Sequence, residues 1–165
     1  DRPTQFPATL PKVVRDGRAA GPIPVLVTPL TGGVFKNGKL DNNLDEWSEE
    51  VRKVAAATKT PLVDLNRRSA AIVQKLGAED SLALAQAEPT AEERAAAKAG
   101  TTLKQRSTED AREPDLPTRP GGARGQHTRK FDYTHLGETG AGVFARVMAD
   151  DLARAVPALA SQLVP

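Results

Sequence analysis

Two short aliphatic runs, each followed by a helical pattern, constrain the fold of this chain most strongly. Residues 23–28 read Ile-Pro-Val-Leu-Val-Thr and residues 61–65 read Pro-Leu-Val-Asp-Leu, and such runs are typical of strands buried on both faces. The helix between them is predicted from apolar residues spaced by three and four: Leu44, Trp47, Val51, Val54 and Ala55. A second, short helix is expected over residues 70–76, ending at Gly77. Strand, helix, strand, helix predicts an α/β fold with a parallel sheet.

Further elements flank this core. Apolar residues at helical spacing from Phe6 to Val14 predict a helix broken at Pro11, because proline lacks the backbone donor. Residues 31–43 are rich in Gly, Asn and Lys and predict a loop, with Asn37-Gly38 as a tight turn. A long C-terminal helix is predicted from one apolar stripe, formed by Ala141, Phe144, Ala145, Met148, Leu152 and Val156.

Residues 86–130 form a polar segment in which the only aliphatic side chains larger than alanine are Leu103 and Leu116. Burying this little apolar surface cannot offset the conformational entropy that the segment would lose on ordering. We therefore expect a mobile insertion, above all at residues 114–125. Within it, Thr90 and Glu93 match a capping box and predict a solvated helix over residues 90–99.

Charge and composition exclude several classes of function. The net charge is only +2, from 23 basic and 21 acidic residues spread along the chain, so we expect no nucleic-acid partner. No apolar run approaches the roughly 20 residues that cross a bilayer, so no membrane partner is expected. The absence of cysteine excludes disulfides and thiolate chemistry, but it fits both a reducing compartment and an exported bacterial protein. The compartment therefore stays open, with a secreted or periplasmic location as one option.

The candidate site is Asp132-Tyr133-Thr134-His135, which leads into the C-terminal helix. A carboxylate three residues before a histidine can hold the imidazole in the tautomer that accepts a proton from a hydroxyl group. A surface ion pair is the alternative interpretation of this spacing. The other histidine, His127, lies in a segment rich in glycine and arginine and is expected to be exposed.

Three segments, in order, resemble the SGNH (GDSL-type) hydrolases, and more narrowly bacterial rhamnogalacturonan acetylesterase-like proteins. Residues 131–152, from Phe-Asp-Tyr-Thr-His-Leu-Gly-Glu-Thr-Gly-Ala onward, resemble the last conserved block of that family. Residues 21–30 are similar to its fourth strand. Residues 61–71 are similar to its fifth strand and the helix that follows. The resemblance covers most of the chain outside the polar segment.

This resemblance implies the C-terminal portion of a flavodoxin-like, three-layer α/β/α fold. Residues 1–85 would form the C-terminal half of the hydrolase domain, with two strands and three helices. Residues 86–130 would be the insertion, and residues 131–165 the catalytic block and C-terminal helix. By the same resemblance His135 would be the general base and Asp132 its orienting carboxylate, with no metal or cofactor.

The resemblance also implies parts that this chain does not contain. The family's nucleophilic serine lies in a Gly-Asp-Ser turn, and its oxyanion hole includes the asparagine of a Gly-x-Asn-Asp segment. Neither segment occurs here; Asp80-Ser81 follows a helix instead of a strand. We therefore expect the first half of the domain, with the serine and the oxyanion donors, to lie upstream of Asp1.

Several functions follow from these expectations. The first is a serine-type carbohydrate O-acetylesterase acting on an acetylated polysaccharide such as pectin. Within the same mechanism, the substrate could instead be a lipid or another small ester. The alternatives are a truncated, inactive fragment or interaction module, and a chain that completes an esterase together with a separate N-terminal chain.

Overall fold

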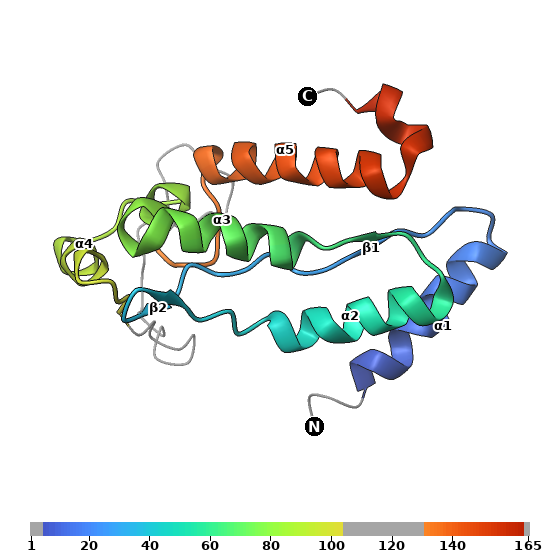
Figure 1. Cartoon of the computed structure of the whole chain (residues 1–165), viewed down its shortest axis with the longest axis horizontal. Coiled ribbons are helices and arrows are strands. Elements are labelled where there is room, and N and C mark those ends of the chain that lie inside the picture. The colour runs from blue at the N-terminus through green and yellow to red at the C-terminus, as the bar shows by residue number, and fades with distance from the viewer. Residues whose placement is uncertain (1–4, 104–130, 164–165) are drawn as a thin grey trace, which may run out of the picture. The chain divides into compact units, whose positions relative to one another are not determined.

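The computed structural model describes residues 5–103 and 131–163. Its contacts divide the chain into two compact units, which are described separately. Unit 1 comprises Asp1–Gly32, Asn42–Lys75 and Gly142–Pro165, and unit 2 comprises Gly33–Asp41 and Leu76–Ala141. Figure 1 traces the elements in chain order.

Unit 1 contains a pair of parallel strands, β1 (Leu26–Val27) and β4 (Leu62–Val63). Leu26 N donates to Pro61 O at 2.9 Å, and Thr28 N donates to Val63 O at 3.1 Å. Both predicted strands are therefore confirmed, although each is shorter than its aliphatic run. The burial on both faces that was expected for the first strand is incomplete, because Val27 is 41% exposed whereas Leu26 and Thr28 are buried. Nothing in the described part of the chain pairs with the outer edge of β1 to cover it.

Helices of unit 1 cover both faces of this pair (Figure 1). These helices are α1 (Gln5–Ala19), α2 (Asp45–Thr58), the first part of α3 (Leu65–Asp80) and most of α5 (Glu138–Ala155). One core joins the strands to α1 and α2 through Leu10, Val14, Leu26, Val51, Val54, Ala55 and Leu62. The other joins them to α3 and α5 through Val25, Leu30, Val63, Leu65, Ile72, Val147, Met148, Leu152 and Ala155. Successive strand residues thus face opposite layers, and the predicted general α/β class is confirmed.

The helices differ from the sequence prediction at two places. α1 runs through Pro11 as one helix, so the predicted break there is wrong. α3 is longer than expected, because it begins at Leu65, directly after β4, and continues to Asp80. Two helices meet at Gly77 within this span, where a φ of 78° departs from helical geometry, so the helix end predicted at Gly77 is confirmed. The predictions of α2 and α5 are confirmed.

Polar side chains form a hydrogen-bonded network at the carboxyl ends of β1 and β4. Thr28 Oγ1 donates to Asp64 Oδ1 at 3.1 Å and accepts from Asn66 N at 2.8 Å. Arg52 of α2 binds both oxygens of Asp64, with Nε–Oδ2 at 2.9 Å and Nη2–Oδ1 at 3.1 Å. These bonds satisfy the buried polar groups and fix the start of α3 against α2.

Unit 2 contains a small hairpin of β2 (Phe35–Lys36) and β3 (Lys39–Leu40). Asn37 and Gly38 have φ of 51° and 76°, the pair of positive values that a tight hairpin turn requires, so the predicted turn is confirmed. The surrounding segment was predicted as loop alone, and the two short strands correct this. Phe35 is fully buried, and its backbone pairs with Thr102, whose N donates to Phe35 O at 3.0 Å.

The polar segment also contributes structure to unit 2. Its helix α4 (Ala91–Lys98) begins with the predicted capping box: Thr90 Oγ1 accepts from Glu93 N at 3.2 Å, and Glu93 Oε2 accepts from Thr90 N at 2.7 Å. Two 3-10 helices, η1 (Ser81–Leu84) and η2 (Pro157–Gln162), complete the described elements. The mobility expected for residues 114–125 concerns positions outside the described residues.

Candidate active site

The candidate site lies in unit 2, in the loop that leads into α5. Asp132 Oδ1 accepts hydrogen bonds from the backbone N of Thr134 and the backbone N of His135, both at 2.7 Å. An aspartate that binds the amides two and three residues onward closes a local turn by itself. The Asp-x-x-His sequence therefore builds the turn that places the two functional side chains together.

The second oxygen of Asp132 holds the imidazole. Asp132 Oδ2 lies 2.9 Å from His135 Nδ1, and it also accepts from Gln86 Nε2 at 3.1 Å. The Asp132 side chain is 24% exposed, whereas that of His135 is 70% exposed. The carboxylate is thus partly enclosed, and the imidazole it holds is open to a substrate.

The protonation of Asp132 decides which imidazole nitrogen can act. Burial opposes ionisation of this carboxyl group, but the backbone N–H groups of His135 and Thr134 and the imidazole outweigh it and lower the pKa of Asp132. An ionised carboxylate only accepts hydrogen bonds, so His135 Nδ1 must donate. In the neutral imidazole this leaves the lone pair on Nε2, where a general base needs it.

Two glycines let the loop lie directly on the chain at residues 84–86. Gln86 N donates to His135 O at 3.0 Å, and Gly137 N donates to Leu84 O at 2.8 Å. A Cβ atom on Gly137 would lie 2.4 Å from Ala85 O, and one on Gly140 would lie 2.3 Å from Leu84 O. The close approach that fixes His135 therefore requires glycine at both positions.

No protein-family model, curated protein or solved structure matches this chain. The relationship to SGNH hydrolases accordingly remains a prediction from the three segments quoted above. No helix of the described residues is both long and apolar enough to span a bilayer. Residues 5–103 and 131–163 also contain no group of three or more side chains that could hold a metal ion.

A serine-type role would require a hydroxyl group beside the imidazole of His135. Among the described residues, no serine or threonine hydroxyl forms a hydrogen bond with His135. Ser81 is buried in η1, and its hydroxyl donates to Ala78 O at 3.1 Å. A buried hydroxyl committed to a helix carbonyl cannot be deprotonated by an exposed imidazole, so Ser81 does not form a catalytic pair with His135.

Four further residues bear on the candidate site: Gln86, Phe35, Trp47 and His127. Gln86 was not singled out from the sequence, because one glutamine at the start of a polar segment carries no distinguishing pattern. Phe35 is completely buried, so its ring cannot stack on a sugar. Trp47 is half-buried on α2. His127 lies outside the described residues.

Proposed function

We propose that this chain carries the base and the orienting carboxylate of a serine-type carbohydrate O-acetylesterase, of the kind its three segments resemble. The supporting observation is the 2.9 Å contact between Asp132 Oδ2 and His135 Nδ1, with the rest of the imidazole exposed. The turn closed by Asp132 holds the imidazole through Nδ1 and leaves most of the ring exposed, as proton transfer at Nε2 requires.

In the proposed reaction, His135 Nε2 takes the proton from a serine hydroxyl as its oxygen attacks the acetyl carbonyl carbon. The charged imidazole, stabilised by Asp132, then donates that proton to the departing sugar oxygen. Water next attacks the acetyl-serine and gives a proton to His135, which passes it to the serine oxygen as the acyl–oxygen bond breaks and acetate leaves. The serine and the oxyanion donors belong to the Gly-Asp-Ser and Gly-x-Asn-Asp segments that the resemblance implies outside this sequence.

The test is acetate release from acetylated pectin by the protein in its full natural length. Because the base acts in both half-reactions, His135→Ala should lower kcat by at least about a thousandfold. His127→Ala is the matched control, since it removes the only other histidine, and it should keep normal activity. Retention of activity in His135→Ala would refute the assignment. Comparing acetylated pectin with lipid and aryl esters then separates a carbohydrate esterase from a lipase of the same mechanism.

A second candidate function is a catalytically inactive interaction module. The observation in its favour is that no described hydroxyl group pairs with the imidazole of His135. This function predicts that the chain by itself hydrolyses p-nitrophenyl acetate no faster than buffer and gains no activity when mixed with a separate polypeptide carrying the Gly-Asp-Ser and Gly-x-Asn-Asp segments. Activity that appears only on mixing would favour a split esterase.

A further inference from the structure

A hollow of about 420 Å³ opens on the surface of unit 1, and none of residues 132–135 lines it. Its wall comes from the end of β4, the first turns of α3 and the last turns of α5. The lining residues are Leu62, Asp64, Arg67, Arg68, Asp151, Arg154 and Ala155. Three guanidinium groups therefore share one small concave surface with two carboxylates and two apolar side chains.

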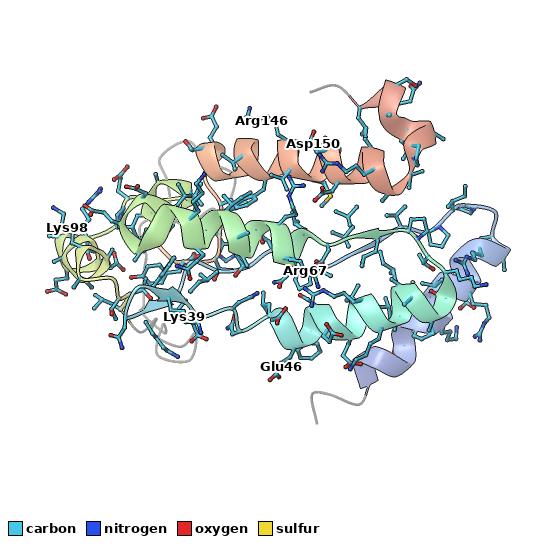
Figure 2. The ribbon with its side chains drawn as sticks, viewed as in Figure 1. Lys39, Glu46, Arg67, Lys98, Arg146 and Asp150 are labelled. Atoms are coloured by element: carbon cyan, nitrogen blue, oxygen red, sulfur yellow. The ribbon has the colours of Figure 1, made fainter. Side chains whose placement is uncertain are left out.

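The first carboxylate leaves Arg67 largely uncommitted. Asp64 is already held by the two-point contact with Arg52, which lies on α2 outside the hollow. Arg67 Nε approaches Asp64 Oδ2 only to 3.5 Å, and its side chain is 75% exposed. Figure 2 labels Arg67 near the start of α3. The ion pair with Asp64 is therefore long, and most of the Arg67 side chain stays exposed to solvent.

The second carboxylate is shared by two arginines. Arg68 Nη1 and Arg154 Nη1 both donate to the same oxygen, Asp151 Oδ1, at 2.8 Å. One carboxylate offsets one of the two positive charges, and each guanidinium has five N–H donors, of which this contact uses one. Asp151 thereby holds the two guanidinium groups near each other, and each keeps further N–H groups that can donate to a ligand.

We propose that this hollow binds the carboxylate or phosphate group of a small anionic ligand. Arginine presents its donors as a planar fork that matches both kinds of oxyanion, often through two parallel hydrogen bonds. Arg68 and Arg154 form the fixed part of the site because Asp151 orients them. Arg67 supplies the third donor group, and Leu62 and Ala155 contact the apolar part of the ligand. The proposal does not depend on the esterase function.

The experiment is a titration of the chain with inorganic phosphate and, separately, with galacturonate, at constant ionic strength. The readout is the set of arginine Nε–Hε signals in ¹H–¹⁵N spectra. Saturable shifts of the Arg67, Arg68 and Arg154 signals with either anion support the site, and the tighter-binding anion identifies the ligand class. No saturable shift with either anion overturns the proposal.

Three variants distinguish this site from a general effect of charge. Arg67→Gln and Arg154→Gln should each weaken binding roughly tenfold, the scale of one charge-assisted hydrogen bond. Arg146→Gln is the matched control: it removes the same charge from α5, at an exposed position labelled in Figure 2, outside the lining of the hollow. Arg67 takes no part in the Arg68–Asp151–Arg154 contacts, so weaker binding by Arg67→Gln, with an unchanged circular dichroism spectrum, reports the loss of this guanidinium. Equal weakening by Arg67→Gln and Arg146→Gln would refute a specific site.

Discussion

Asp132 holds His135 at two points, through its imidazole and through its backbone. Oδ2 contacts Nδ1 at 2.9 Å, while Oδ1 accepts from the backbone N at 2.7 Å. Because one carboxylate fixes both the ring and the main chain, the ring orientation follows from the turn itself. Gln86 adds a third constraint by donating to Oδ2.

Asp132→Asn should abolish most of the proposed esterase activity without unfolding the protein. The asparagine oxygen can still accept from the backbone, but its amide would donate to Nδ1 and so place the imidazole proton on Nε2. That tautomer cannot accept a proton from serine, and the carboxylate of a catalytic triad is worth about 10⁴ in kcat. Steady-state kinetics of the full-length protein would measure the loss of kcat, with circular dichroism as the folding control. A kcat within about tenfold of wild type would exclude the proposed role.

Gly140→Ala should destabilise unit 2 by more than about 2 kcal/mol. The added Cβ would lie 2.3 Å from Leu84 O, a backbone atom that cannot move aside alone. Gly142→Ala is the control on the same helix, since nothing lies within 4 Å of its added Cβ. It should stabilise the chain by about 0.5–1 kcal/mol through helix propensity. Urea unfolding would give the free energy of unfolding of both variants. Equal changes in the two variants would contradict the close packing of Gly140 against Leu84 O.

Acid should weaken the Arg52–Asp64 contact. Burial raises the pKa of Asp64, but the hydrogen bonds from Arg52, the Arg67 backbone and Thr28 outweigh it, so the folded pKa lies below the usual 3.8. A lowered folded pKa means that this stabilisation is complete above the unfolded pKa and is lost as pH falls through the folded value. The free energy of unfolding of wild type should therefore drop between about pH 5 and pH 2 by more than that of Asp64→Asn. Identical drops in the free energy of unfolding for wild type and Asp64→Asn would show that Asp64 does not contribute to the acid sensitivity of the fold.

Thr90→Ala should cost about 1 kcal/mol, confined to the start of α4. The substitution removes the oxygen that accepts from Glu93 N and so opens the capping box. Thr101→Ala is a comparison outside the cap, where the hydroxyl accepts from Asn37 N at the same distance, 3.2 Å, in an equally exposed contact. Amide hydrogen exchange of residues 91–94 should accelerate only in Thr90→Ala. Unchanged exchange there would mean that the cap does not hold the helix.

Features that depend on residues three or four positions apart were predictable. The stripe that begins at Leu44 gives α2, the Thr90/Glu93 pair gives the cap of α4, and Asn37-Gly38 gives the hairpin turn. The Asp132/His135 contact belongs to this group, because the turn that forms it spans four residues. In each case the interacting atoms are brought together by local backbone geometry.

The tertiary structure decided which distant segments cover these elements. Phe35 is a core residue because Thr102 pairs with it, and Gln86 joins the candidate site because residues 84–86 bind the backbone of the loop that carries Asp132 and His135. Arg68 meets Asp151 across 83 positions. The pattern of apolar and polar residues specifies which side of an element is buried. It does not specify the partner, because many segments of similar polarity could bury the same surface, and only packing of the whole unit selects one.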